Sequence, residues 1–288
     1  MSAPSLADSL NRAGVTLQAA GVDSPRLDAE LLLAYCLGVQ RSYLLAHLEE
    51  PLPAARQNLF ATLVARRAAR EPLAYIIGER WFYGLALAVT PAVLIPRPET
   101  ELLVEAALNW VRTHGDRVCR LVDVGTGCGA IAIAVAVHTN SSAITILATD
   151  IAAEALTLAR RNAERHGVAG RVAFLQSDLL AMMAQPVDVV LANLPYVAEL
   201  DRSDLMPEVR DYEPATALFA GPDGLAQIGR LLAQGQDGVR PGGALYLEIG
   251  WNQGAAAANL ARRHFPTADV AILPDLAGLD RLLCIQTH

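Results

Sequence analysis

The segment Asp123-Val124-Gly125-Thr126-Gly127-Cys128-Gly129-Ala130 decides the fold of this 288-residue chain. It follows an apolar run typical of a strand, at residues 118–123, and leads into an apolar run typical of a helix, at residues 129–138. Glycines between a strand and a helix allow a tight turn and let a ligand approach the backbone closely. The segment therefore predicts a strand, a turn and a helix, with a ligand site at the turn.

The same strand-then-helix pattern continues toward the C-terminus. Further strands are expected at residues 144–149, 171–176, 187–192, 243–249, 267–273 and 281–287, and further helices at 152–166, 224–237 and 252–264. Such alternation is typical of a mostly parallel sheet that is covered by helices on both faces. Residues 97–288 are therefore expected to form one α/β domain.

The N-terminal part has a different pattern. Residues 1–73 show helical spacing of apolar side chains, interrupted by prolines, and predict a small all-α domain. In residues 74–96, aromatic and β-branched residues alternate around Gly78 and Gly84, which predicts a β-hairpin that links the two domains.

Composition excludes several kinds of chemistry. All 23 basic residues are arginine, so the chain cannot supply the lysine of a phosphate-binding P-loop, of a Schiff base or of a protein kinase. The formal net charge is −7, whereas nucleic-acid-binding surfaces are usually basic. Acids and arginines balance in the helical part, so the excess negative charge arises from the rest of the chain.

Cysteines, histidines and the apolar runs indicate a cytoplasmic protein without a metal or a membrane span. The four cysteines and six histidines are scattered with no ligand spacing, so reduced core thiols are expected and no metal site. The N-terminus lacks a basic start followed by an apolar run, so no signal peptide is expected. The uncharged run from Val124 to Thr149 is broken by glycines and polar residues and fits a turn, a helix and a strand better than a membrane span.

The glycine segment by itself allows two nucleotide cofactors. Gly125, Gly127 and Ala130 satisfy the dinucleotide pattern GxGxxG/A, and Gly125, Gly127 and Gly129 satisfy the GxGxG pattern of S-adenosylmethionine enzymes. Asp150 ends the next predicted strand and could accept hydrogen bonds from ribose hydroxyls, or it could cap a helix.

Asp178 and Leu179 follow the third predicted strand of the domain. The carboxylate could accept a hydrogen bond from an adenine amino group while the leucine covers the ring. An aspartate in a strand-to-helix loop is common, so this signal is weak.

Asn193-Leu194-Pro195-Tyr196, here called the tetrad, favours methyl transfer over hydride transfer. It follows a buried apolar strand, at the sheet edge that faces the ligand in open α/β folds. An amide or arylamine nitrogen is planar, and its two hydrogens must be held while its lone pair turns toward a methyl donor. The Asn193 side-chain oxygen and a backbone carbonyl near Leu194 can accept those hydrogens, Tyr196 can stack on the planar group, and Pro195 fixes the backbone.

Several segments resemble the release-factor glutamine methyltransferases of the PrmC/HemK type. They are residues 71–78 (EPLAYIIG), 94–101 (LIPRPETE), 212–218 (YEPATAL), 221–225 (GPDGL), 248–253 (EIGWNQ) and 275–278 (DLAG), besides the glycine segment and the tetrad. The resemblance covers nearly the whole chain. It implies a Rossmann-like, seven-stranded class I methyltransferase domain that is preceded by a helical domain.

The resemblance also implies an activity and its residues. The methyl donor would be S-adenosyl-L-methionine, with S-adenosyl-L-homocysteine as product and no metal. The acceptor would be the side-chain amide of the glutamine in the Gly-Gly-Gln motif of peptide chain release factors, which the helical domain would help to dock. The implied cofactor-binding residues are Gly125, Thr126, Gly127, Cys128, Gly129, Asp150, Asp178, Leu179 and Asn193. The whole tetrad would bind substrate, with Asn193, Pro195 and Tyr196 as the catalytic residues.

Two positions depart from the family pattern. Leu194 stands where the tetrad usually has a first proline, and Cys128 stands where serine or threonine is usual. Because the role of position 194 is to supply a backbone carbonyl, the chemistry is expected to survive with slightly less rigidity. Cys128 keeps a small side chain, so little effect is expected.

An adenine amino methyltransferase acting on DNA or RNA is the alternative, because Asn-Leu-Pro-Tyr also occurs in ribosomal RNA adenine dimethyltransferases. Residues 199–213, just after the tetrad, hold six acids and two arginines, a net charge of −4. That charge would repel phosphates, which favours a protein substrate over a nucleic acid. A solvated acidic loop without a functional role would have the same composition.

Overall fold

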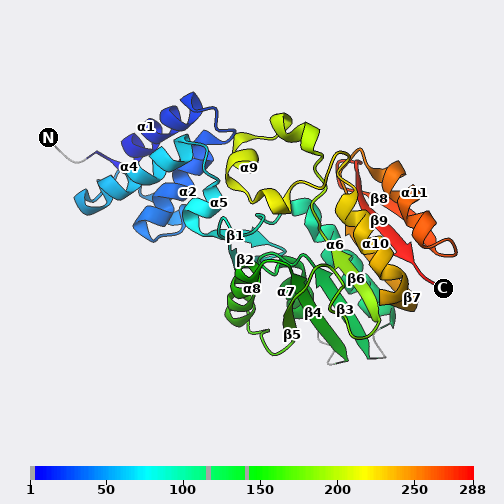
Figure 1. Cartoon of the computed structure of the whole chain (residues 1–288). Helices are drawn as coiled ribbons and strands as arrows, with labels where there is room; N and C mark the ends of the chain where they lie inside the picture. Colours follow the sequence, from blue (N-terminus) through cyan, green and yellow to red (C-terminus); the bar gives the residue numbers. More distant parts are fainter. Residues whose placement is uncertain (1–3, 115–117, 140–142) are drawn as a thin grey trace. The chain divides into compact units, whose positions relative to one another are not determined.

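The computed structural model describes residues 4–114, 118–139 and 143–288. The chain divides into two compact units (Figure 1). Unit 1 consists of Met1–Glu79 and Met206–Tyr212, and unit 2 consists of Arg80–Leu205 and Glu213–His288. Among the described residues, no helix combines the length and the apolar character that crossing a membrane requires.

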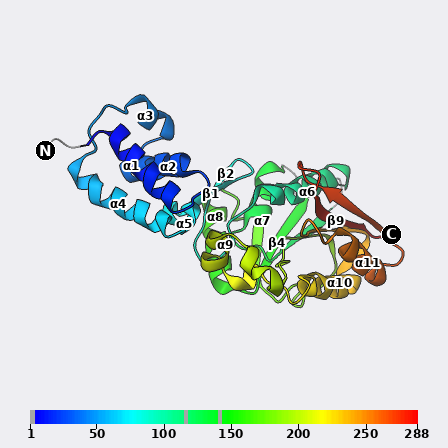
Figure 2. The ribbon, with the colours of Figure 1, turned by 90° about the horizontal axis from the view of Figure 1, so that it is seen from above.

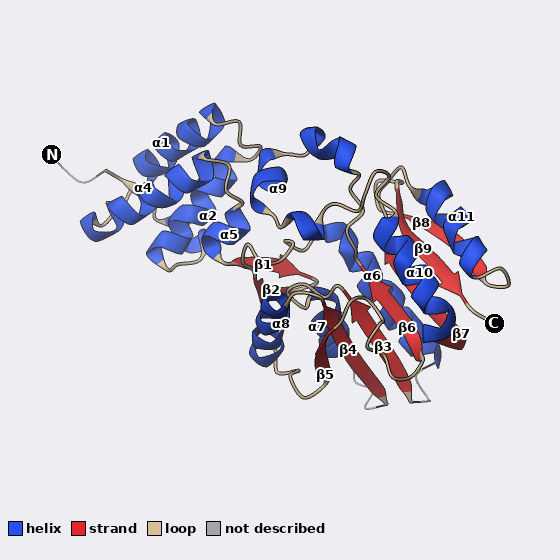
Figure 3. Ribbon diagram, in the orientation of Figure 1, coloured by secondary structure: helices blue, strands red, loops and turns tan. Residues whose placement is uncertain are grey.

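Five helices form most of unit 1 (Figure 3). They are α1 (Leu6–Ala19), α2 (Pro25–Leu37), α3 (Arg41–Ala46), α4 (Ala54–Ala68) and α5 (Leu73–Ile77). The Ser5 hydroxyl and the Asp8 carboxylate cap the first turn of α1 reciprocally, and Pro25 begins α2, where its missing N–H costs nothing. Leucines from α1, α2 and α3 are fully buried between the helices, which confirms the predicted helical domain.

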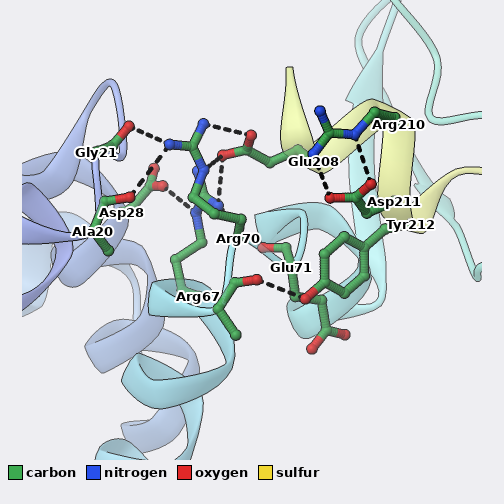
Figure 4. Close-up of polar contacts among 11 residues, drawn as sticks. Ala20, Gly21, Asp28, Arg67, Arg70, Glu71, Glu208, Arg210, Asp211 and Tyr212 are labelled. Carbon is green, nitrogen blue, oxygen red and sulfur yellow. Dashed lines mark hydrogen bonds and ion pairs between the residues drawn. The ribbon is translucent and has the colours of Figure 1, made fainter. Parts of the chain in front are cut away.

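A short segment from much later in the chain also belongs to unit 1. Residues 206–212, here called the strap, contain helix α9 (Pro207–Tyr212). Figure 4 shows Glu208 of the strap within reach of Arg67 and Arg70, with Asp28 on the other side of Arg67. The Tyr212 hydroxyl donates to the Ala69 carbonyl at 2.6 Å. The sequence boundaries do not anticipate this placement, because the strap lies about 130 residues beyond the helices that it contacts.

The predicted hairpin is shorter than expected. Strands β1 (Glu79–Phe82) and β2 (Leu85–Ala88) pair through a tight turn at Tyr83 and Gly84, which both have positive φ. Residues 74–77 belong instead to helix α5, which Pro72 precedes and the left-handed Gly78 ends. The prediction of a hairpin over 74–96 was therefore wrong at both ends. At its start, a proline before the apolar run and a glycine after it favour a short helix, and beyond β2 residues 89–97 form turns and irregular loop.

Unit 2 contains a seven-stranded sheet with the order β5-β4-β3-β6-β7-β9-β8. The strands are β3 (Cys119–Val124), β4 (Ile144–Asp150), β5 (Val172–Gln176), β6 (Val187–Ala192), β7 (Val239–Glu248), β8 (Asp269–Pro274) and β9 (Asp280–Gln286). Among the described strands of this sheet, the β7–β9 and β8–β9 pairings are antiparallel and the others are parallel. The mostly parallel sheet that the sequence predicted is confirmed.

Helices cover both faces of this sheet, as the buried strands require. They are α6 (Glu101–His114), α7 (Ala130–His138), α8 (Ala153–Arg165), α10 (Ala226–Gly238) and α11 (Gly254–His264). Helix α7 packs against α6 and α8, and α10 packs against α11. Figure 2 shows α6 on one side of the sheet, with α10 and α11 on the other.

The strand order reverses between β3 and β6. From β3 the chain proceeds outward to β4 and β5, and from β6 it proceeds the other way to β7. Val124 at the end of β3 pairs with Ala192 at the end of β6 and with Thr149 of β4. The next residues, Gly125 and Asn193, therefore begin their loops side by side at the topological switch point, where open α/β sheets bind ligands.

Candidate functional site

The glycine turn after β3 needs its glycines for backbone geometry and for packing. Gly125, Gly127 and Gly129 have φ of 73°, 56° and 87°, a region that side chains disfavour. A Cβ at Gly129 would lie 2.7 Å from a methyl of Ile133 and 3.1 Å from Cβ of Ala159. The turn is thus held close to helix α8, with bare backbone toward the cavity.

Asp123 holds the glycine turn through hydrogen bonds. One carboxylate oxygen accepts hydrogen bonds from the Thr126 hydroxyl at 2.6 Å and from the Ala132 N–H at 3.1 Å. Complete burial raises the pKa of Asp123 to about 7 despite these two bonds. The neighbouring Cys128 is also buried, which raises the pKa of its thiol to about 12 and keeps it neutral.

Asp150 accepts hydrogen bonds from two backbone N–H groups. One oxygen accepts from the Gly127 N–H and the other from the Ala152 N–H, each at 2.9 Å, so it braces the glycine turn and the start of α8. Each carboxylate oxygen has a further lone pair. Asp150 lines the cavity and keeps acceptor capacity for a ribose hydroxyl.

Asp178 and Leu179 lie in the same cavity, after β5. Asp178 forms an ion pair with Arg230 at 2.5 Å, which is a partner that sequence reasoning did not find. The pair leaves the second carboxylate oxygen of Asp178 for a ligand, and Leu179 is buried beside it with a positive φ of 54°.

The tetrad, which follows β6, also borders the cavity. Asn193, Leu194 and Pro195 line it, whereas Tyr196 does not. Leu194 is 5% exposed, and a Cβ at Gly125 would lie 3.1 Å from a Leu194 methyl. The leucine at this unusual position therefore packs directly on the glycine turn and joins the two loops.

A buried network next to the tetrad contains Thr100 and Glu248, which no local sequence pattern singles out. Thr100 ends the short helix η1 (Pro98–Thr100), and Glu248 ends β7. The Asn193 Nδ2 group donates to the Thr100 hydroxyl at 2.9 Å, which donates to Glu248 at 2.7 Å. The Tyr196 hydroxyl donates to the other oxygen of Glu248 at 3.3 Å.

Burial dominates the titration of this network. It raises the pKa of Glu248 to about 7, against the opposing effects of the Thr100 hydrogen bond, the Arg281 charge and the Tyr196 hydroxyl. Glu99 adds a smaller increase. Burial, and then the nearby Glu248 charge, raise the pKa of Tyr196 as well, so its phenol stays protonated.

Gln253 fixes the end of the tetrad. Its Nε2 group donates to the Tyr196 carbonyl at 2.9 Å and to the Asp223 carbonyl at 3.1 Å, while its Oε1 accepts from the Gly250 N–H at 2.8 Å. A Cβ at Gly224 would collide with the Tyr196 carbonyl. Because the backbone at Gly224 lies so close to the Tyr196 carbonyl, this position requires a glycine. That requirement accounts for Gly224 in the segment 221–225 that carries part of the family resemblance.

The four predicted ligand-binding segments therefore meet in one cavity. Further lining residues come from before α6, from α8 and from the segment after the strap; they include Ala92, Val93, Leu94, Pro96, Ile151, Ala155, Pro214, Thr216 and Ala217. No sequence periodicity marks these residues, although residues 94–101 and 212–218 were quoted for the family resemblance.

The acidic segment 199–213 is less negative than its own composition indicates. Glu208 pairs with Arg67 and Arg70. Glu213, which is buried, pairs with Arg97 and accepts from the Ile95 N–H at 3.3 Å. Because the charge of Arg67 is also balanced by Asp28, the net offset comes from Arg70 and Arg97 and amounts to about half of the segment's net charge of −4. The repulsion of phosphates that was inferred from sequence is correspondingly weakened.

Metal ligands are not gathered in the part of the chain that the structure describes: no group of three His, Cys, Asp or Glu side chains could hold an ion there. The four cysteines form no disulfide, and Cys36, Cys119 and Cys128 are buried, in line with the predicted core thiols.

The sheet order, the antiparallel β9 between β7 and β8, and the glycine turn beside the tetrad define a class I methyltransferase. Residues 99–209 match the model of the methyltransferase small domain, and residues 8–78 match that of the PrmC N-terminal domain. A release factor glutamine methyltransferase of Nitratidesulfovibrio vulgaris is 41% identical over 95% of this chain and 92% of its own length. One of Cereibacter sphaeroides is 42% identical over 96% of each chain. The chain belongs to the release factor glutamine methyltransferase family.

Solved structures support the fold alone. The hMettl16 catalytic domain, in complex with the MAT2A 3′UTR hairpin 6, is 16% identical with a TM-score of 0.57, over 78% of this chain and 82% of that one. The Thermus thermophilus 16S rRNA N2 G1207 methyltransferase, in complex with AdoMet and guanosine, is 15% identical with a TM-score of 0.52, over 73% of this chain and 50% of that one.

Proposed function

We propose that this chain transfers a methyl group from S-adenosyl-L-methionine to the side-chain amide nitrogen of the glutamine in the Gly-Gly-Gln motif of peptide chain release factors. The observation that carries the proposal is the placement of Asn193 and Leu194 directly beside the glycine turn, in one cavity at the switch point. The family to which the chain belongs supports the substrate, since its members are named release factor glutamine methyltransferases.

The residues of the cavity suit the methyl donor. Bare backbone at Gly125, Gly127 and Gly129 admits a ligand, and Asp150 and Asp178 offer acceptors at the ends of neighbouring strands. When bound, S-adenosylmethionine supplies a methyl group that its sulfonium activates. We assign the cofactor to these residues with Thr126, Cys128, Leu179 and Asn193, and no step of the reaction calls for a metal.

Orientation of the acceptor amide is the main task of the tetrad. Asn193 Oδ1 and the Leu194 carbonyl accept the two amide hydrogens, which turns the nitrogen lone pair toward the methyl group, and Pro195 holds these acceptors in place. The nitrogen forms the new C–N bond as the C–S bond breaks, and the electron pair of that bond leaves with sulfur. One N–H proton then passes to water, because it becomes acidic on the quaternised nitrogen, so no strong base is needed beforehand.

Tyr196 was predicted to stack on the planar acceptor. Its hydroxyl is bonded to Glu248, which fixes the direction of the ring, but the ring does not line the cavity. Stacking of the ring on the acceptor therefore stays a prediction, since the Tyr196 hydroxyl is directed to the buried Glu248.

Radiolabelled methyl transfer tests the substrate. The acceptors are a release factor, the same factor with Gln→Ala in its Gly-Gly-Gln motif, ribosomal RNA and DNA. We expect label on the intact release factor alone. Label on a nucleic acid, with none on the factor, would establish the adenine amino methyltransferase alternative instead.

Asn193→Ala tests the site. Loss of a preorganised acceptor should lower kcat about 10²–10³-fold, while calorimetry should find only a modest change in S-adenosylmethionine affinity. Asn252→Ala, at an exposed asparagine that does not line the cavity, is the matched control and should keep full activity. Full activity of the Asn193 variant would overturn the assignment.

A further inference from the structure

Asn193 offers the cavity either an oxygen or an NH2 group, depending on how its side-chain amide is rotated. The two orientations have nearly the same shape, yet only the oxygen can accept a hydrogen from an acceptor amide. Something must therefore select the orientation. The buried network of Thr100 and Glu248 contacts this amide through the Thr100 hydroxyl.

Proton counting in the network selects one orientation. A threonine hydroxyl has one hydrogen, and an ionised carboxylate only accepts. When Glu248 is ionised, above its pKa of about 7, the Thr100 hydrogen goes to the carboxylate 2.7 Å away, and the Thr100 oxygen faces Asn193 as an acceptor. The group that meets it at 2.9 Å must be the Nδ2 donor. Since the amide is planar, Oδ1 then points away from Thr100.

Both residues are almost completely buried, which makes the selection strong. Thr100 is 3% exposed and Glu248 is 2% exposed. With the amide reversed, Oδ1 of Asn193 would face the lone pairs of the Thr100 oxygen, and a buried acceptor would lack its hydrogen bond. The hydroxyl of Tyr196 occupies the other oxygen of Glu248 and ties the fourth tetrad residue to the same carboxylate.

We propose that Thr100 and Glu248 are positioning residues, which fix the Asn193 amide with Oδ1 toward the acceptor nitrogen. The proposal rests on the proposed function for its effect on catalysis, but the orientation itself can be measured without substrate. Neither residue was found from the residue pattern alone, because they lie 93 and 55 positions from Asn193 along the chain.

Thr100→Val removes the hydroxyl and keeps the shape of the side chain. We expect kcat for release factor methylation to fall at least about tenfold, while the affinity for S-adenosylmethionine changes less than about threefold. Thr100→Ser restores the hydroxyl and should recover most of the rate. Glu248→Gln should act like Thr100→Val, because its amide can donate to Thr100 and reverse the chain of hydrogen bonds.

A double variant separates positioning from general damage. If Thr100 acts through Asn193, then Thr100→Val added to Asn193→Ala should change kcat less than about twofold, because the group that it positions is already gone. Thr126→Val is the matched control: it removes an equally buried hydroxyl–carboxylate bond, to Asp123 at 2.6 Å, with no contact to Asn193. Its effect should multiply with that of Asn193→Ala.

Side-chain amide NMR tests the orientation directly. In protein labelled with 15N-asparagine, the Asn193 signal is identified by its loss in Asn193→Ala. Thr100→Val should shift this signal and speed its exchange with water, whereas Thr126→Val should leave it unchanged.

Three outcomes would overturn the positioning role: an unchanged amide signal in Thr100→Val, an unchanged kcat, or effects that multiply with Asn193→Ala. A wild-type enzyme that methylates no release factor would instead refute the proposed function, while the amide signal would still decide the orientation.

Discussion

Replacement of Glu208 by glutamine should loosen the strap from the helices of unit 1. Glu208 accepts two hydrogen bonds from the Arg70 guanidinium, at 2.7 and 2.6 Å, and it forms an ion pair with Arg67 at 2.9 Å. Arg67 also bonds to Asp28 at 2.7 Å, and both Arg67 and Glu208 are buried. The four side chains form one neutral network, drawn in Figure 4.

The size of the loss in the free energy of unfolding depends on which partners the two arginines keep after the substitution. Removing one partner of a buried ion pair costs about 3–5 kcal/mol, because the other charge stays buried. Here Arg67 keeps Asp28, and Arg70 keeps the backbone carbonyls of Ala20 and Gly21. We therefore expect a smaller loss, about 2–3 kcal/mol in the free energy of unfolding of unit 1.

Urea unfolding followed by circular dichroism measures this loss. A loss of this size should lower the midpoint of the unit 1 transition by about 2 M, with a denaturant slope near 1 kcal/mol per M. Amide hydrogen exchange should become faster in residues 206–212. The matched control is Asp211→Asn, which breaks the exposed pair with Arg210 and should leave the midpoint unchanged.

The pH dependence gives the same reasoning an independent check. Burial alone would raise the pKa of Glu208, but the hydrogen bond from Arg70, and then the other bonds and the Arg67 charge, hold it below the ordinary 4.5. A lowered pKa contributes stability that is present above pH about 4.5 and is lost as pH falls through the folded-state value. The difference between wild type and Glu208→Gln should therefore shrink on acidification. Equal midpoints of the two proteins at pH 7 would refute the reasoning.

Three further predictions concern the cavity. Leu194→Ala should lower the free energy of unfolding by about 2–4 kcal/mol, measured by thermal or urea unfolding, whereas the volume-conserving Leu194→Met should cost less than about 1.5 kcal/mol. Gly129→Ala should weaken S-adenosylmethionine binding at least about tenfold by calorimetry, because its Cβ would lie 2.7 Å from an Ile133 methyl and 3.1 Å from Cβ of Ala159, and because its φ is positive. The kcat should fall as pH drops through about 7, where Glu248 gains a proton, and Glu248→Gln should remove that step from the pH–rate profile.

Local patterns predicted the strands of the seven-stranded sheet and helices α7, α8, α10 and α11 of unit 2, because each rests on neighbours in sequence. The segment from Asp123 to Ala130 specifies a strand, a turn and a helix by its own composition, and the repeated alternation specifies a parallel sheet. The start of the hairpin was wrong because Pro72 and Gly78 enclose an apolar run of only five residues, too short to separate helix from strand by periodicity. The strap was missed because its partners lie in distant helices.

The residues of the site divide in the same way, into those that local patterns predict and those whose role depends on distant partners. Residues that follow strand ends, such as Asp150 and Asn193, could be predicted because every parallel strand delivers its carboxyl end to one edge of the sheet. Thr100 and Glu248 could not, since their role is a hydrogen bond to a partner that only the folded sheet brings near. The net charge counted for residues 199–213 overstated the repulsion of phosphates for a similar reason. A count within the segment leaves out its partners Arg67, Arg70 and Arg97.

Leu194 illustrates what the fold adds to a sequence pattern. The loss of a proline at this position indicated a tetrad with less rigidity, because proline restricts the backbone by itself. In the structure the leucine side chain is buried against Gly125 and joins the core that includes Val124 and Ala192. Packing can restrict a backbone as proline does, but through contacts with another loop. The position of the Leu194 carbonyl then depends on the glycine turn, so changes at Gly125 should alter methyl transfer as well as cofactor binding.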